Sequence, residues 1–75
     1  MSKLPVLKPA ELVRILERLG FQRIRQKGSH LYLRHADGRA TVVPIHRGED
    51  LPPGLLRAIL HDIELTRDQF LDELK

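Results

Sequence analysis

The spacing of apolar residues changes twice along this 75-residue chain, and the change restricts the folds that it can form. Apolar side chains recur at intervals of three and four, then at every second position, then again at intervals of three and four. The first spacing gathers side chains on one helix face, and the second gathers them on one face of a strand. The pattern therefore predicts a helix, a sheet and a second helix. The helical sets are Leu12, Ile15, Leu16 and Leu19, and later Leu56, Ile59, Leu60 and Ile63.

Local signals indicate where the helices begin and end. Pro9 suits the first turn of a helix, and Gly20 can adopt the left-handed conformation that ends one. Thr66 and Gln69 have the spacing of a capping box, which begins a short third helix. The predicted helices cover about residues 9–19, a segment opening at Pro52-Pro53, and about residues 67–74.

Glycine-containing pairs divide the middle of the chain into strands. Lys27-Gly28 and Asp37-Gly38 are typical of turns between antiparallel strands. Pro44 cannot donate a ladder hydrogen bond, so the third strand is expected at a sheet edge. The predicted strands cover about residues 21–27, 29–35 and 40–46. We therefore predict a single α+β domain over residues 1–75, in the order αβββα(α), with a three-stranded antiparallel sheet and the helices on one face.

Charge is divided unevenly along the sequence. Residues 1–48 carry a net charge of +7 and residues 49–75 a net charge of −4, which leaves +3 for the whole chain. A basic surface attracts polyanions, so nucleic acid is a candidate partner, and the alternative is an ordinary solvated surface.

Several absences narrow the class of protein. The chain has no cysteine, which excludes disulfides, thiolate chemistry and cysteine-ligated zinc, and fits a reducing compartment. Residues 1–9 contain no continuous apolar stretch of the kind found in targeting signals, and no segment has the length of a membrane span. These features predict a soluble cytoplasmic protein with no membrane partner, and a domain this small has no room for a deep internal pocket.

The second hairpin determines which side chains lie on the open face, the face of the sheet that no helix covers. Leu31 and Leu33 belong in the core, so the alternating residues between and around them point to the open face. A three-residue loop over residues 36–38, with Gly38 in the left-handed conformation, buries Val43 and Ile45 beside these leucines. The same offset brings His46 close to His30 on the open face.

The first hairpin adds the cations. A two-residue turn at Lys27-Gly28 pairs Ile24 with Leu31 in the core, and Phe21, which does not follow the alternation, is assigned to the first helix. The same turn places Arg25 opposite His30 and Arg23 opposite Tyr32. The predicted open face gathers Arg23, Arg25, Lys27, His30, Tyr32, Arg34 and His46.

This set of side chains suits cleavage of RNA. An imidazole can take a proton from a ribose 2′-hydroxyl at neutral pH, and neighbouring cations can bind the phosphate. His30 is therefore the candidate acid or base, and Arg25 and Lys27 are candidate phosphate ligands. Tyr32 can stack on a base or bond to the sugar, and the amides of Gly28-Ser29 can add an anion site. The structural alternative is an exposed strand histidine beside a tyrosine that only packs.

The remaining histidines leave several roles open. His46 is a candidate second acid or base, a phosphate contact, or simply a strand-end residue. His35 faces away from His30 near the rim of the sheet, and His61 lies on the surface of the second helix. No pair of histidines has the helical spacing of metal ligands beside a cluster of acids, so no metal site is predicted.

A family resemblance adds to this interpretation. The chain contains, in order, LERLGF at the end of the first helix, RQKGSHLYLRHADGR through the first hairpin, TVVPIH in the third strand, and LPPGLLRAIL and TRDQFL near the end. In order and spacing these segments resemble the HicA toxins of bacterial and archaeal HicAB toxin–antitoxin systems. The resemblance covers about residues 9–74, and GSH followed by P-x-H is its most specific part.

The resemblance implies a fold related to the double-stranded-RNA-binding domain and ribosome-independent cleavage of mRNA and tmRNA. It implies that His30 is catalytic, with Gly28 and Ser29 completing the motif, and that a cognate HicB antitoxin binds the toxin and masks this histidine. We therefore expect the toxin of a type II toxin–antitoxin system, a metal-independent endoribonuclease of single-stranded RNA that uses no cofactor. A non-catalytic RNA-binding module of the same fold is the alternative, and a protein-docking domain is a third candidate.

Overall fold

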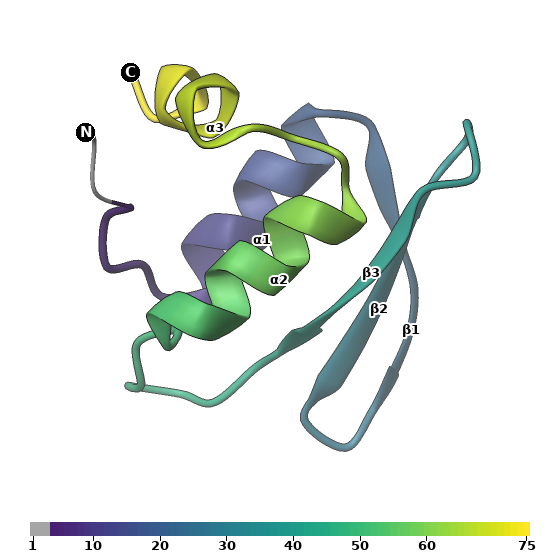
Figure 1. Ribbon diagram of the computed structural model, residues 1–75. Coiled ribbons are helices and arrows are strands. Elements are labelled where there is room, and N and C mark those ends of the chain that lie inside the picture. Colours follow the sequence, from purple (N-terminus) through teal and green to yellow (C-terminus); the bar gives the residue numbers. More distant parts are fainter. Residues whose placement is uncertain (1–3) are drawn as a thin grey trace.

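Three strands form one antiparallel sheet in the order β1-β2-β3, and the helices lie together on one side of it (Figure 1). The computed structural model describes residues 4–75. Its elements are α1 (Pro9–Arg18), β1 (Phe21–Lys27), β2 (His30–His35), β3 (Ala40–Pro44), α2 (Pro53–Asp62) and α3 (Arg67–Glu73). The α+β class and the αβββα(α) order predicted from the sequence are confirmed, with the other face of the sheet open.

The helix ends follow the local signals. The backbone N–H of Lys8 donates to Glu11 Oε1 at 3.1 Å before α1, and Gly20 ends the segment with φ +101°. The capping box before α3 is present in both directions, because Gln69 N–H donates to the Thr66 hydroxyl at 3.1 Å and Thr66 N–H donates to Gln69 Oε1 at 2.8 Å.

The core lies between the helices and the covered face of the sheet. Leu31, Leu33 and Val43 project into it from the strands, and Phe70 closes it from α3 with no exposed surface. Burying each such side chain stabilises the fold by about 1.5–3 kcal/mol. The helices contribute Leu12, Val13, Ile15, Leu16, Leu56, Ile59 and Leu60.

The second hairpin has the predicted offset. Leu31 lies opposite Val43, Gly38 has φ +101°, and the N–H of His35 donates to Arg39 O at 2.8 Å across the three-residue loop. The third strand is shorter than predicted and ends at Pro44, since the chain leaves the sheet for the turn before Leu51.

The first hairpin differs from the prediction by one residue. Its turn is Gly28-Ser29, so that Lys27 lies opposite His30, and the predicted pairing of Arg25 with His30 is wrong. A β-bulge follows between Arg23 and Arg25, with Ile24 as the extra residue.

The bulge exchanges the residues that enter the core. Ile24 is 58% exposed, so its predicted burial beside Leu31 is wrong. Beyond the bulge, Phe21 lies opposite His35 on the helix side and is 2% exposed. The register shift buries the larger aromatic side chain and leaves the isoleucine at the sheet edge, which is the favourable choice because an aromatic ring buries more apolar area.

None of the helices between residues 4 and 75 combines the length and the apolar character that a membrane span requires.

Candidate functional site

The open face of the sheet is basic. Its paired positions carry three cations and one imidazole, and none of them is occupied by an acidic residue. An anion that approaches this face therefore meets no carboxylate on the strands. The residues at these positions are Gln22, Arg25, Lys27, His30, Tyr32, Arg34, Ala40, Val42 and Pro44.

His30 is the first residue of β2, the central strand. It is exposed and lies between Lys27 on β1 and Pro44 on β3, whereas the next residue, Leu31, is 4% exposed and in the core. The alternation of the strand thus turns the imidazole to the open face, as predicted. The cation directly opposite it is Lys27.

The turn before His30 is tied to the third strand. The N–H of Ile45 donates to Ser29 O at 2.6 Å, and the amide of Gln26 donates to Gly28 O at 3.2 Å. Gly28 has φ +58°, and no atom lies within 4 Å of a Cβ built on it, so one side of the turn is unobstructed. A phosphate could approach the backbone here without steric hindrance.

Arg25 and Tyr32 form a stacked pair on the open face. They are cross-strand partners, and the guanidinium carbon of Arg25 lies over the Tyr32 ring, 4.9 Å from its centroid. Arg25 is exposed and Tyr32 is half-buried. Arg34 also lies on this face, opposite Gln22 and Ala40, and is exposed. Among residues 4–75, no carboxylate forms an ion pair with Arg25, Lys27 or Arg34.

Arg23 does not lie where it was predicted. The bulge places it opposite Leu33 and not opposite Tyr32, on the helix side of the sheet. Its guanidinium pairs with Glu17 of α1 at 3.3 Å. The open face therefore has one cation fewer than the sequence predicted.

His46 lies beyond the end of β3. The ladder continues only to the bond between Ile45 and Ser29, so the register does not assign His46 to the open face. Its exposed side chain lines a shallow pocket with residues of the loop and both main helices, among them Pro9 and Leu55. His30 is not part of that pocket. Lys8 stabilises the loop that contains His46. Its ammonium group forms an ion pair with Asp50 at 2.7 Å and donates a hydrogen bond to Gly48 O at 3.3 Å.

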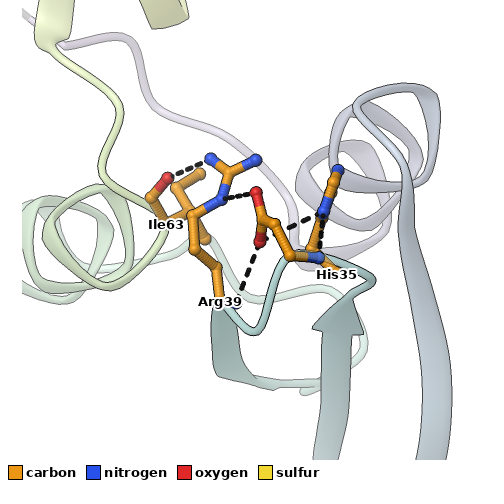
Figure 2. A network of polar contacts seen from close by, with 4 residues as sticks. His35, Arg39 and Ile63 are labelled. Carbon is orange, nitrogen blue, oxygen red and sulfur yellow. Dashed lines mark hydrogen bonds and ion pairs between the residues drawn. The ribbon is translucent and has the colours of Figure 1, made fainter.

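A second polar cluster lies at the opposite end of the sheet (Figure 2). The Arg39 guanidinium donates to Asp37 at 2.8 Å and to the carbonyl of Ile63 at the end of α2, and it lies over the Phe21 ring. His35 Nδ1 accepts the backbone N–H of Asp37 at 3.0 Å, and its ring packs edge-on against Phe21. The cluster ties the second hairpin to β1 and to the end of α2.

The pKa of the Asp37 carboxyl lies below its ordinary value. The backbone N–H of Arg39 donates to Asp37 Oδ1 at 3.0 Å, and this bond, with the Arg39 guanidinium, lowers the pKa of the carboxyl below its ordinary value. Sequence analysis did not find this cluster, because the contacts of Arg39 with Ile63 and Phe21 join residues that are far apart in the chain. Asp37 before Gly38 was the only local signal, and it was assigned to a turn alone.

Within the part of the chain that the structure describes, no three histidine or acidic side chains converge on a point that could hold a metal ion. His35 and His61 lie away from the open face, on the helix side and on α2 respectively.

Comparison with known protein families supports a family assignment. A search among curated proteins finds no significant match. The family model for the HicA toxin of bacterial toxin–antitoxin systems matches residues 9–65, from the start of α1 through α2. This match spans most of the domain and includes all three strands, with the turn that precedes His30. The chain therefore belongs to the HicA toxin family.

Proposed function

We propose that this toxin is a ribosome-independent endoribonuclease that cleaves mRNA and tmRNA in the cytoplasm and so inhibits translation and growth. The observation that carries the proposal is the exposed His30 opposite Lys27, on a sheet face with three cations and no acid at its paired positions. Family membership makes the chain a toxin with a cognate antitoxin. The basic face supports a polyanionic substrate.

The chemistry follows from the groups on this face. His30 accepts the proton of a ribose 2′-hydroxyl, whose oxygen attacks the adjacent phosphorus and displaces the 5′-oxygen, leaving a 2′,3′-cyclic phosphate. Lys27, directly across the strands, stabilises the charge that builds on the phosphate oxygens. The unobstructed turn at Gly28-Ser29 gives the phosphate access to this pair. No step of this scheme needs a metal ion or a cofactor.

A single assay tests the residue and the chemistry together. Purified wild-type protein is incubated with RNA in the presence of a chelator, beside His30→Ala and the control His61→Ala on the exposed surface of α2. We expect cleavage by the wild type and by His61→Ala, and a loss of about 10²–10⁴-fold for His30→Ala. A folded His30→Ala protein that cleaves normally would refute the role of His30. Binding without any cleavage would favour the non-catalytic RNA-binding alternative.

The same assay with a modified substrate tests the attack itself. RNA with 2′-deoxyribose at the cleavage position should resist cleavage, because the attacking hydroxyl is missing. Normal cutting of that substrate would contradict the proposed attack.

A second acid must protonate the leaving 5′-oxygen, and His46 is the candidate. Its loop begins next to the turn that carries His30, through the bond from Ile45 to Ser29. If His46 donates this proton, His46→Ala removes one limb of the bell-shaped pH–rate profile. Lys8→Ala, which frees the loop, lowers the maximal rate and leaves both limbs. An unchanged profile for His46→Ala would transfer the role to Lys27, to His30 itself or to water.

The antitoxin proposed as partner is a HicB protein that covers His30. The open face, which the helices leave uncovered, is the surface that such a partner must occupy to block RNA. Protection of His30 from a histidine-modifying reagent in the purified complex, compared with the free toxin, would test this directly.

A further inference from the structure

Arg25 covers one side of the Tyr32 ring, on which the sequence analysis allowed a base to stack. Tyr32 is the chain's only tyrosine and, among the paired strand positions of this face, the only large aromatic side chain. The Arg25 guanidinium already lies over its ring, 4.9 Å from the centroid. A base cannot stack on that side of the ring while the guanidinium is there.

The guanidinium is itself a stacking surface. It is planar and weakly hydrated, and nucleobases stack on it as they do on aromatic rings. Arg25 is exposed, whereas Tyr32 beneath it is half-buried, so the side of the pair that faces solvent is the arginine. The aromatic ring holds the flexible arginine side chain flat against the sheet and lowers the entropy that would be lost when a base binds.

The backbone supports the same arrangement. The turn at Gly28-Ser29 brings Arg25 opposite Tyr32, and two residues further along β1 the next outward side chain is Lys27, opposite His30. The pair of Arg25 with Tyr32 and the pair of Lys27 with His30 are thus successive outward-facing pairs of the same two strands. Outward-facing residues two apart along a strand lie roughly 7 Å apart, which is close to the spacing of neighbouring nucleotides.

We propose that Arg25, supported by Tyr32, is the base-stacking residue of the RNA site, and that it positions an unpaired nucleotide next to the one cleaved at His30. This inference rests on the proposed function. It changes the role of Arg25 from a phosphate ligand to a stacking group and leaves Lys27 as the phosphate ligand. It also requires single-stranded RNA, because a base within a duplex has no free face for the guanidinium.

The test measures the affinity of wild-type and variant proteins for two non-cleavable probes. One is a short single-stranded 2′-O-methyl RNA, and the other is the same sugar–phosphate chain without bases. Removing the bases should weaken wild-type binding by about tenfold. Arg25→Lys keeps the positive charge but loses the planar guanidinium. This variant should bind the first probe about tenfold more weakly than the wild type does, and the second probe equally well. Tyr32→Phe should behave as the wild type, and Tyr32→Leu as Arg25→Lys.

Arg34→Lys is the matched control. It makes the same chemical change on the same face, at an arginine that, among residues 4–75, has no aromatic ring beneath it. Arg34→Lys should change the affinity for both probes by the same factor, because a contact with phosphate does not depend on the bases. A duplex of the first probe should bind about tenfold more weakly than the single strand.

The outcomes separate this inference from the proposed function. If wild-type protein cleaves RNA but Arg25→Lys binds the two probes with the same relative affinity as the wild type, Arg25 contacts phosphate only and the inference is wrong. If Arg25→Ala increases the ratio of the affinity for the first probe to the affinity for the second, the base stacks on the uncovered Tyr32 ring. That result would also overturn the inference. Failure of the wild type to bind or cleave any RNA would instead refute the proposed function, and the inference with it.

Discussion

The His35 imidazole packs directly against the backbone of Gly20, so that a Cβ atom built on Gly20 would lie 2.8 Å from His35 Nε2. Gly20 also has φ +101°, a conformation that other residues rarely adopt. The turn between α1 and β1 thus requires glycine for two separate reasons, one of conformation and one of space.

Replacing Gly20 should destabilise the fold more than replacing Gly38, which has the same backbone conformation. Gly38 has the same φ of +101° but no atom within 4 Å of a Cβ built on it. We expect Gly38→Ala to lower the free energy of unfolding by about 1 kcal/mol, the cost of the left-handed conformation alone. Gly20→Ala should lower it by about 1–2 kcal/mol more, because His35 must move. Urea denaturation measures both values. Equal losses in the free energy of unfolding would show that the His35 contact does not add to the cost of the substitution.

Arg39 connects the second hairpin to the end of α2 and to β1, so its removal should destabilise the fold. Its guanidinium bonds Asp37 and the carbonyl of Ile63 (Figure 2). It also lies over the ring of Phe21. We expect Arg39→Ala to lower the free energy of unfolding by about 2 kcal/mol. Arg39→Lys should recover little of this loss, because an ammonium group lacks the planar fork. The control Arg57→Ala, on the exposed side of α2, should stay within about 0.5 kcal/mol of the wild type.

Asp37 should make the fold sensitive to acid. Its pKa is lower in the folded chain than its ordinary value, mainly because its carboxylate accepts the Arg39 backbone N–H. The ionised carboxylate therefore contributes stability above the ordinary pKa, and this contribution is lost as the pH falls through the lower folded-state pKa. Melting temperatures recorded from neutral to strongly acidic pH should fall less steeply for Asp37→Asn than for the wild type.

The control for this effect is a double variant. In an Arg39→Gly background the hairpin loses the guanidinium but keeps the backbone N–H, so Asp37→Asn should still flatten the profile, though by less. Identical profiles for the wild type and Asp37→Asn would contradict the assigned cause.

The bulge in β1 can be tested through the two residues whose environments it exchanges. Ile24 is exposed at the sheet edge, so Ile24→Thr should change the free energy of unfolding by no more than about 0.5 kcal/mol. Phe21 is buried against His35 and Arg39, so Phe21→Ala should cost about 3–5 kcal/mol. A substantial loss for Ile24→Thr would favour the regular register, in which that side chain faces the core.

The fold class could be predicted because its signals are local. The helical spacing of Leu12, Ile15 and Leu16 and the alternation through Leu31 and Leu33 each specify one element and its buried face. The same alternation places His30 outward without any knowledge of the tertiary structure. The offset of the second hairpin was also predicted correctly, since only one choice buries Val43.

The first hairpin could not be predicted in this way. A turn at Lys27-Gly28 and a turn at Gly28-Ser29 both use Gly28, so local chemistry does not choose between them. The choice depends on whether Ile24 or Phe21 enters the core, and that is decided by the helices and loop packed on the sheet.

The sequence by itself therefore determined the elements, their order and the face to which His30 points, because each depends on side-chain periodicity within one segment. Only the tertiary structure decided that Arg25 stands over Tyr32, that Arg23 turns to Glu17, and that His46 leaves the sheet. These placements depend on the position of the first turn, a one-residue bulge and a strand end, whose free energies are set by burial and by pairing between segments.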